Sequence, residues 1–248
     1  MPAFIMWIIW KRRNNIKHGG NVTLNNMIWQ VQDMIRKLLK SLYPWMKIGK
    51  KDWPHMVNLL KKYKPRLHYY CVTWKFPARD RVKCNIDGAC RGNPGMSALA
   101  FCVRDEFGDL IYATARGIGI ATNTEAESMA IKEALGFCQS INLKEVTIET
   151  YSLTLKTMIE REWKVPWDLI EMIEGIRVQM QLIQANIKHI YREGNAVADL
   201  LANEVVDTQD TNEYHSFYEL PAHIRKHINM DKAQIPNLRI RTRRINNK

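Results

Sequence analysis

Alternating apolar and polar residues predict a strand that ends at an acid. Apolar side chains at positions 82, 84 and 86 alternate with polar ones at 83, 85 and 87, the period of a half-buried strand. Asp87 closes this pattern, and the stretch 88–95, rich in glycine with Asn93 and Pro94, forces a turn. An acid beside a turn whose backbone approaches a ligand closely suits a metal or phosphate site. An Asp-Gly turn in an ordinary hairpin has the same residues, so this stretch alone leaves both interpretations open.

The pattern downstream predicts a mixed α/β sheet. Strands are expected over 99–103, 110–120, 145–150 and 187–191, and helices after the cap at 122–124, around 153–162 and 167–180, and from Asn195. Hairpins join the first three strands. A helical crossover leads to the fourth strand and makes it parallel. We therefore predict five strands, three antiparallel and then two parallel, flanked by helices.

The N-terminal part is predicted to be helical. Apolar residues recur at helical spacing from Leu24 to Leu42, and a shorter helix is expected over 57–63. The apolar stripe of the first helix must pack on something, so a protein partner at this amphipathic helix is one expectation. We divide the chain into a basic helical region and linker (1–80), a central domain (81–207) and a basic C-terminal tail (208–248).

Charge is distributed unevenly along the 248 residues. The net formal charge is +12, made up of +13 for residues 1–80, −5 for 81–207 and +4 for 208–248. Such basic flanks can hold a polyanion by releasing counterions, which favours nucleic acid as a partner. Solvated helix faces are the alternative explanation for any single pair of lysines.

Cysteine usage and hydropathy indicate the compartment. The five cysteines form no CxxC pair, so we expect reduced thiols in an intracellular protein of the nucleus or cytoplasm. No apolar run approaches the roughly 20 residues of a membrane span, and no membrane association is expected.

Three acids stand at the ends of predicted elements. These are Asp87, Glu127 in the first turn of the helix after 122–124, and Asp199 in the first turn of the last helix. Glu127 could instead complete a capping box with Thr124, and Asp199 suits the positive end of a helix. If the carboxylates cluster, they require protons or a cation, and oxygen ligands without a His/Cys pattern select Mg²⁺ or Mn²⁺.

Four stretches, in order, resemble the type-1 ribonuclease H domain found at the C-terminus of plant non-LTR retrotransposon reverse transcriptases. They are Asn85-Ile-Asp-Gly-Ala-Cys-Arg-Gly-Asn-Pro-Gly95, Val103-Arg-Asp-Glu-Phe-Gly108, Thr122-Asn-Thr-Glu-Ala-Glu127 and His189-Ile-Tyr-Arg-Glu-Gly-Asn-Ala-Val-Ala-Asp199. The resemblance covers about residues 81–206. It implies a nuclease that cuts the RNA strand of an RNA/DNA hybrid with two metal ions.

The resemblance also assigns roles to residues. It implies that Asp87, Glu127 and Asp199 are catalytic acids that bind Mg²⁺ or Mn²⁺.

Nucleic-acid contacts follow from the same motifs. Asn93 matches a contact to RNA 2′-hydroxyls, and Thr122 and Asn123 match a pocket for a DNA phosphate. Ser152 is expected on the same nucleic-acid surface. Arg192 could hold a phosphate, and an ion pair with Glu193 is an equal alternative.

One position departs from the family pattern. The family has Glu-Thr/Ser-Asp-Ser after the fourth strand, whereas this chain reads Glu149-Thr-Tyr-Ser152, so Tyr151 replaces the fourth acid. A neutral phenol is a poor Mg²⁺ ligand, and Glu149 is expected about 6.6 Å further back along the strand. Two hypotheses remain: a working or weakened ribonuclease H, and a non-catalytic, retroelement-derived module that binds nucleic acid or protein. We favour the second for activity.

Overall fold

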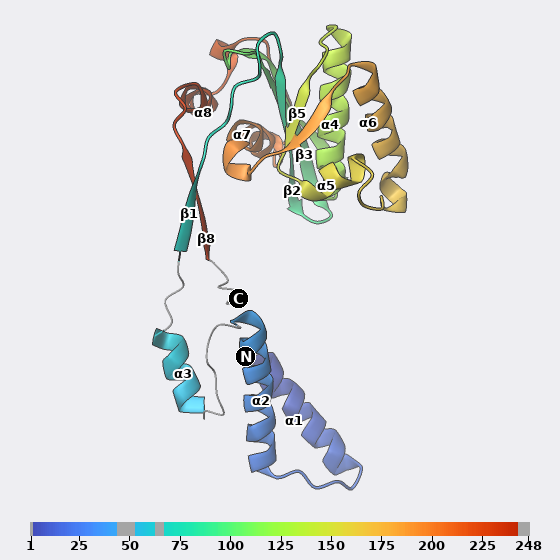
Figure 1. Ribbon diagram of the computed structural model, residues 1–248. Coiled ribbons are helices and arrows are strands. Elements are labelled where there is room, and N and C mark those ends of the chain that lie inside the picture. Colours follow the sequence, from blue (N-terminus) through green and yellow to red (C-terminus); the bar gives the residue numbers. More distant parts are fainter. Residues whose placement is uncertain (1, 44–52, 63–66, 243–248) are drawn as a thin grey trace. The chain divides into compact units, whose positions relative to one another are not determined.

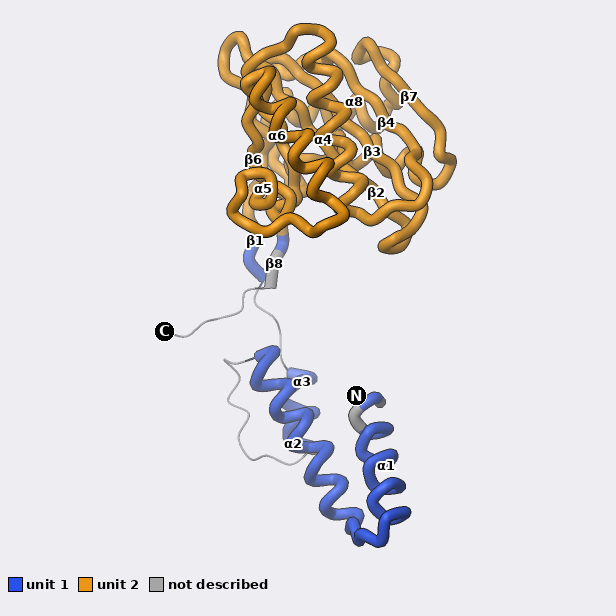
Figure 2. The backbone as a smooth tube through the Cα atoms, turned by 90° about the vertical axis from the view of Figure 1, so that its right-hand side faces the viewer, with its two compact units in different colours: residues 1–69, 240–248 blue, residues 70–239 orange. Residues whose placement is uncertain are grey.

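The computed structural model describes residues 2–43, 53–62 and 67–242. The chain divides into two compact units, residues 1–69 with 240–248 and residues 70–239 (Figure 2). The basic C-terminal tail predicted over 208–248 extends beyond the described residues, which end at 242. No helix in the described ranges is long and apolar enough to cross a membrane.

The larger unit is built on a mixed sheet, as predicted. Its strand order is β6-β5-β2-β3-β4-β7. β2, β3, β4 and β7 pair antiparallel, and β5 and β6 are parallel to β2. The strands are β2 (Lys83–Gly92), β3 (Gly95–Arg104), β4 (Leu110–Ala121), β5 (Thr147–Thr150), β6 (Asn186–His189) and β7 (Thr211–Tyr214).

Helices cover both faces of this sheet (Figure 1). They are α4 (Asn123–Ser140), α5 (Leu153–Ile159), α6 (Ile170–Leu182), α7 (Ala196–Val205) and α8 (Ala222–Lys232), with short 3-10 turns η1 (Trp167–Leu169), η2 (Arg192–Gly194) and η3 (Phe217–Glu219). Strand alternation decides which side chain enters which core. In β3, Phe101 and Val103 join the core under α4 and α6, whereas Ala100 and Cys102 join the core under α7 and α8.

The structure corrects three expected boundaries. The predicted first strand does not end at Asp87, because β2 continues to Gly92 and pairs with β3 along its whole length. Residues 208–239 are not a tail: β7 pairs with β4 as a sixth strand, and Leu220, Ile224 and Ile228 are buried in the core. The predicted linker 64–80 contains β1 (Leu67–Val72), which pairs with β8 (Asn237–Thr242).

The smaller unit is helical. Its elements are α1 (Pro2–Lys17), α2 (Leu24–Leu42) and α3 (Trp53–Lys62). Thr23 caps α2 by accepting a hydrogen bond from the Asn26 amide at 3.3 Å. The stripe of α2 buries Ile35 and Leu39 against Met56 of α3, so the predicted amphipathic helix is confirmed.

Candidate functional site

Asp87 of β2 lies near Tyr151, the residue that follows the end of the neighbouring parallel strand β5. β2 pairs with β5 as far as Asn85 and Glu149, and the charge of Asp87 acts on the Tyr151 phenol just beyond this pairing. Asp87 is buried, with 2% of its surface exposed, and its Oδ1 accepts a hydrogen bond from the Gly88 amide at 2.8 Å. Asp87 therefore lies close to the end of β5, the strand that the helical crossover was predicted to make parallel.

Glu127 reaches the same place because α4 crosses directly over Gly88. A Cβ at Gly88 would stand 2.5 Å from the Glu127 amide nitrogen, so only glycine allows this approach. The expected capping box of Thr124 and Glu127 is wrong. Thr122 is the N-cap and Glu125 completes the box, which leaves the buried Glu127 carboxylate free to face β2 and β5.

Tyr151 fills the position between these acids. Hydrogen bonds from Tyr151, Ser152 and Asn123 lower the pKa of Glu127 against the larger, opposing effect of burial. Burial, followed by the charges of Glu127 and Asp87, raises the pKa of the Tyr151 phenol, so it stays a neutral hydroxyl. The side chain that replaces the fourth acid is thus a neutral hydroxyl, which accepts a hydrogen bond from the Asn123 side chain at 3.4 Å.

Asp199 is held by a guanidinium group. Arg192, in η2, donates from Nε to Asp199 Oδ1 at 3.0 Å, and its Cζ lies 5.9 Å from the centre of the Tyr151 ring. Asp199 raises the pKa of Arg192. The alternative ion pair with Glu193 is wrong, because Glu193 binds Arg239 of β8 at 2.7 Å.

The predicted nucleic-acid residues meet at the start of α4. The Asn93 side chain accepts a hydrogen bond from the Asn123 amide at 3.1 Å. The Asn123 side chain donates to Glu127 at 3.0 Å and to the Tyr151 hydroxyl at 3.4 Å. Ser152 caps α5 through the Leu155 amide at 3.4 Å. These contacts join the turn after β2, the first turn of α4 and the end of β5 in one surface.

The electrostatics of the site favour neutralisation. Burial raises the pKa of Asp87 well above its usual value, and the charges of Asp199 and Glu127 raise it further. Burial also raises the pKa of Glu127. Neighbouring buried carboxylates behave this way when each disfavours ionisation of the other. In this arrangement Arg192 and the Tyr151 hydroxyl provide part of the compensation.

The side chains as arranged do not fit a metal centre. Among the described residues, no three Asp, Glu, His or Cys side chains converge as metal ligands do. Asp199 is occupied by Arg192, Glu127 by hydrogen-bond donors, and Tyr151 brings no charge. We therefore assign no metal-dependent step to this site with Tyr151 in place.

A buried polar network that the sequence did not predict lies behind the site. The Asn195 side chain donates to the Ile86 carbonyl at 2.7 Å and accepts from Asn85 at 3.1 Å, which ties the start of α7 to β2. Glu149 accepts from Asn85 at 3.0 Å and forms an ion pair with Lys83 at 2.7 Å. Glu149 therefore cannot replace the missing acid. The signal for it in the sequence was the alternation of polar residues in β2, which we interpreted as the exposed side of a half-buried strand.

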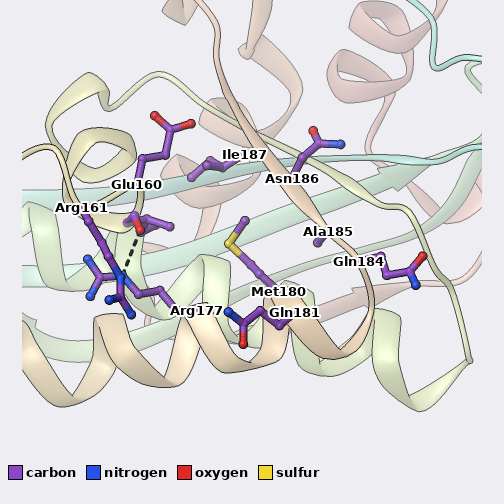
Figure 3. A pocket seen from close by; sticks show the side chains of 10 residues that line it. Glu160, Arg161, Arg177, Met180, Gln181, Gln184, Ala185, Asn186 and Ile187 are labelled. Carbon is purple, nitrogen blue, oxygen red and sulfur yellow. Dashed lines mark hydrogen bonds between the residues drawn. The ribbon is translucent and has the colours of Figure 1, made fainter.

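A separate hollow lies among α5, α6 and β6 (Figure 3) and has a volume of about 720 Å³. Arg161, Arg177 and Gln184 line it, and it contains none of the predicted site residues. Arg177 donates to the Ile159 carbonyl at 2.9 Å and so satisfies the end of α5. This arginine has a structural role.

Together these features define a class of protein. The mixed sheet, with an acid on its central strand, a second acid from the crossing helix and a third at the start of α7, is the arrangement of a ribonuclease H-like domain. Residues 85–205 match the family model described as reverse transcriptase-like. In sequence and fold this domain is similar to type-1 ribonuclease H domains.

Known proteins resemble this domain. A provisionally named ribonuclease H protein of Arabidopsis thaliana is 28% identical over 206 residues, which is 81% of this chain and 30% of that protein. Ribonuclease HI of Halobacterium salinarum is 29% identical over 133 residues, which is 51% of this chain and 65% of that enzyme. The chain therefore spans less than two thirds of either relative.

Solved structures agree on the fold. Ribonuclease H1 of Halobacterium salinarum superimposes with a TM-score of 0.50 at 29% identity, covering 52% of this chain and 98% of that one. The N-terminal ribonuclease H domain of a Mycobacterium tuberculosis protein also has a TM-score of 0.50, at 25% identity, covering 52% of this chain and 95% of that one. The predicted fold class is confirmed.

Proposed function

We propose that this chain binds RNA/DNA hybrids through its ribonuclease H-like domain and that Tyr151 has weakened or abolished hydrolysis. The observation that carries this proposal is the position of Tyr151. It lies near Asp87 and Glu127, whose charges raise the pKa of its phenol, and it supplies no carboxylate. The names of the relatives support the substrate class. A retroelement origin is in keeping with the reverse transcriptase-like family model.

We propose that the chain keeps its nucleic-acid-binding surface although hydrolysis of RNA is weakened or lost. Asn93, Thr122 and Asn123 keep amide, hydroxyl and backbone groups at the start of α4, where a helix N-terminus favours phosphate. Selection of RNA over DNA would require contacts to 2′-hydroxyls, for which Asn93 is the candidate. Mg²⁺ or Mn²⁺ would then matter only if the missing acid were restored.

The proposal predicts binding of hybrid without efficient cleavage. In Mg²⁺ or Mn²⁺ the wild-type chain should retard a labelled RNA/DNA hybrid more strongly than the DNA duplex of the same sequence and release little or no RNA product. Electrophoresis of bound complexes and of denatured products measures both. The alanine variant of Asn93 should reduce the preference for hybrid. Rapid cleavage that Asp87→Asn abolishes would refute the loss of hydrolysis, and equal affinity for both duplexes would refute hybrid recognition.

The basic helix α1 is predicted to add sequence-independent affinity. Lys11, Arg13 and Lys17 are exposed, and no acidic residue precedes Asp33. Replacing the three with glutamine should flatten the plot of log affinity against log salt by about 0.9 for each phosphate that is no longer neutralised. Replacing the exposed Lys132 and Lys144 in the larger unit is the matched control. An unchanged slope in the α1 variant would remove this helix from the binding surface.

A non-catalytic interaction scaffold is the second candidate. The observation that favours it is an apolar groove of about 460 Å³ between α1 and α2, lined by Ile5, Ile9 and Ile28 among others. Trp7 and Trp10 stack at 5.1 Å on the exposed surface of α1. A protein partner at this groove stays a proposal, which Ile9→Glu would test by abolishing any specific complex of the full chain while leaving hybrid affinity intact.

A further inference from the structure

We propose that a second pocket, beside the acid site, binds one unpaired nucleotide. This inference rests on the proposed function for its biological context, although the pocket can be tested without it. The pocket, called here the Tyr191 pocket, has a volume of about 430 Å³ and is lined by Trp74, Lys75, Lys83, Lys188, His189 and Tyr191 among others. All of these residues belong to the larger unit. The volume is in the range of small-molecule sites.

The polar groups at the floor of the pocket already have hydrogen-bond or ion-pair partners within the protein. Lys83 Nζ lies 2.7 Å from Glu149 Oε1 and donates to the Lys75 carbonyl at 2.7 Å. The second oxygen of Glu149 accepts from Trp74 Nε1 at 3.1 Å. The buried charges therefore compensate each other. The floor is neutral and does not itself demand a counter-ion.

The rim of the pocket carries positive charge without compensation. Lys75 and Lys188 are both exposed, and neither has an acidic partner within the ranges that the structure describes. Since Glu149 is committed to Lys83, the net charge of the lining is positive. The ligand that this rim favours is an anion, with phosphate as the group that lysine binds as a point charge.

Tyr191 supplies a stacking surface beside this rim. Its ring is 47% exposed, the Arg239 guanidinium lies 4.3 Å from its centre, and the His189 ring meets it edge to face at 5.9 Å. Arg239 is fixed in turn by Glu193 at 2.7 Å. A ring held in this way is ordered before a ligand arrives. A flat aromatic group next to a phosphate is the chemistry of a nucleotide, and base stacking on aromatic side chains tolerates any sequence.

The pocket adjoins the acid site through two connections. Tyr191 immediately precedes Arg192, which binds Asp199. The Ile190 amide, between His189 and Tyr191, donates to the carbonyl of Thr150, the residue before Tyr151, at 2.9 Å. A strand whose unpaired nucleotide occupies the Tyr191 pocket would therefore pass its neighbouring phosphate close to Arg192. Two sources share this chemistry: a single-stranded overhang next to a hybrid, and a free nucleotide.

Titration of the full chain with uridine monophosphate tests the pocket directly. Calorimetry should detect binding to wild type and to Tyr191→Phe, which keeps the ring, and at least about a fivefold loss in Tyr191→Ala, the cost of one stacked base. Lys188→Ala should lose affinity as well. Tyr218→Ala and Lys132→Ala, at exposed positions outside the pocket lining, are the matched controls. Absent binding, or binding equal in all variants, overturns the proposal.

A second comparison identifies the source of the nucleotide. If the pocket takes a strand, wild type should bind a hybrid with a single-stranded overhang at least about fivefold more tightly than the blunt hybrid, and Tyr191→Ala should remove this difference without changing affinity for the blunt hybrid. Uridine monophosphate binding without any overhang preference would assign the pocket to a free nucleotide. If the nucleotide binds while neither hybrid does, the pocket stands and the proposed hybrid function fails.

Discussion

Replacing Tyr151 with aspartate should convert this chain into an efficient hybrid-cleaving nuclease. The shorter carboxylate would stand level with Asp87 and close to Glu127, where the phenol now fills the space. Four neighbouring acids would demand a divalent cation. Because misplacement of a reacting group alone costs about 100-fold, cleavage in Mg²⁺ should rise by at least that factor. A time course of RNA product release from a labelled hybrid measures it.

Control variants distinguish the effect of a restored metal-binding carboxylate from the effect of removing the bulky tyrosine side chain. Tyr151→Phe keeps the bulk and removes the hydroxyl, so it should stay inactive, and Asp87→Asn in the Tyr151→Asp background should abolish the gained activity. Binding of Mg²⁺ can also be measured without relying on cleavage of the hybrid. Mg²⁺ should raise the melting temperature of Tyr151→Asp more than that of wild type, because a ligand of the folded state stabilises it. If wild type already cleaves at the rate of Tyr151→Asp, three acids suffice and Tyr151 is not the cause of lost activity.

The second large effect is expected at a buried ion pair whose two residues are far apart in the sequence. Arg104 of β3 donates to Asp231 of α8 at 2.7 Å and to the Asn85 side chain at 2.8 Å, and its guanidinium lies 3.6 Å from the centre of a Trp74 ring. The Arg104 side chain is 1% exposed and that of Asp231 8%. Asp231→Asn leaves the guanidinium buried without a counter-charge, which costs about 3–5 kcal/mol. Urea unfolding of the full chain, followed by tryptophan fluorescence, measures the loss.

A double replacement tests the cause of this loss. Arg104→Met combined with Asp231→Leu removes both charges and should recover much of the stability, because the penalty arises from the unpaired charge. The partly exposed pair Arg116–Glu133 is the matched control, and Glu133→Gln should cost less than about 1 kcal/mol. Similar losses in Asp231→Asn and Glu133→Gln would contradict the buried network.

Local patterns predicted the parts of the site that depend on local chemistry. Strand alternation and the helical crossover predicted that the strand after the first long helix runs parallel to the strand that carries Asp87, and the pairing of β2 with β5 agrees. The roles of Glu127 and Arg192 were harder to predict. Thr122 and Thr124 both suit an N-cap, and only the observed start of α4 distinguishes them. The sequence allowed Arg192 to pair with Glu193, but in the structure β8 places Arg239 beside the Glu193 carboxylate.

Contacts between distant segments left no signal in the sequence. β1 and β8 are separated by most of the chain, and their pairing depends on the domain between them. The polar residues of β2 were interpreted as the exposed side of a half-buried strand, whereas the Asn85 side chain is fully buried and forms hydrogen bonds with Glu149, Asn195 and Arg104. Alternation with a period of two identifies a strand, but it does not show whether the polar side chains face solvent or a buried hydrogen-bond network.

The place of β7 and α8 in the larger unit has a consequence for its biosynthesis. The family match ends at residue 205, yet among the residues that the structure describes the outer edge of β4 is paired by β7, and Asp231 is the counter-charge of Arg104. While the chain is being made, the ribosome tunnel therefore still holds β7 and the balancing acid when the last acid of the site, Asp199, emerges. Until β7 follows, the nascent domain has an open sheet edge, the kind of surface that chaperones shield from pairing with other chains.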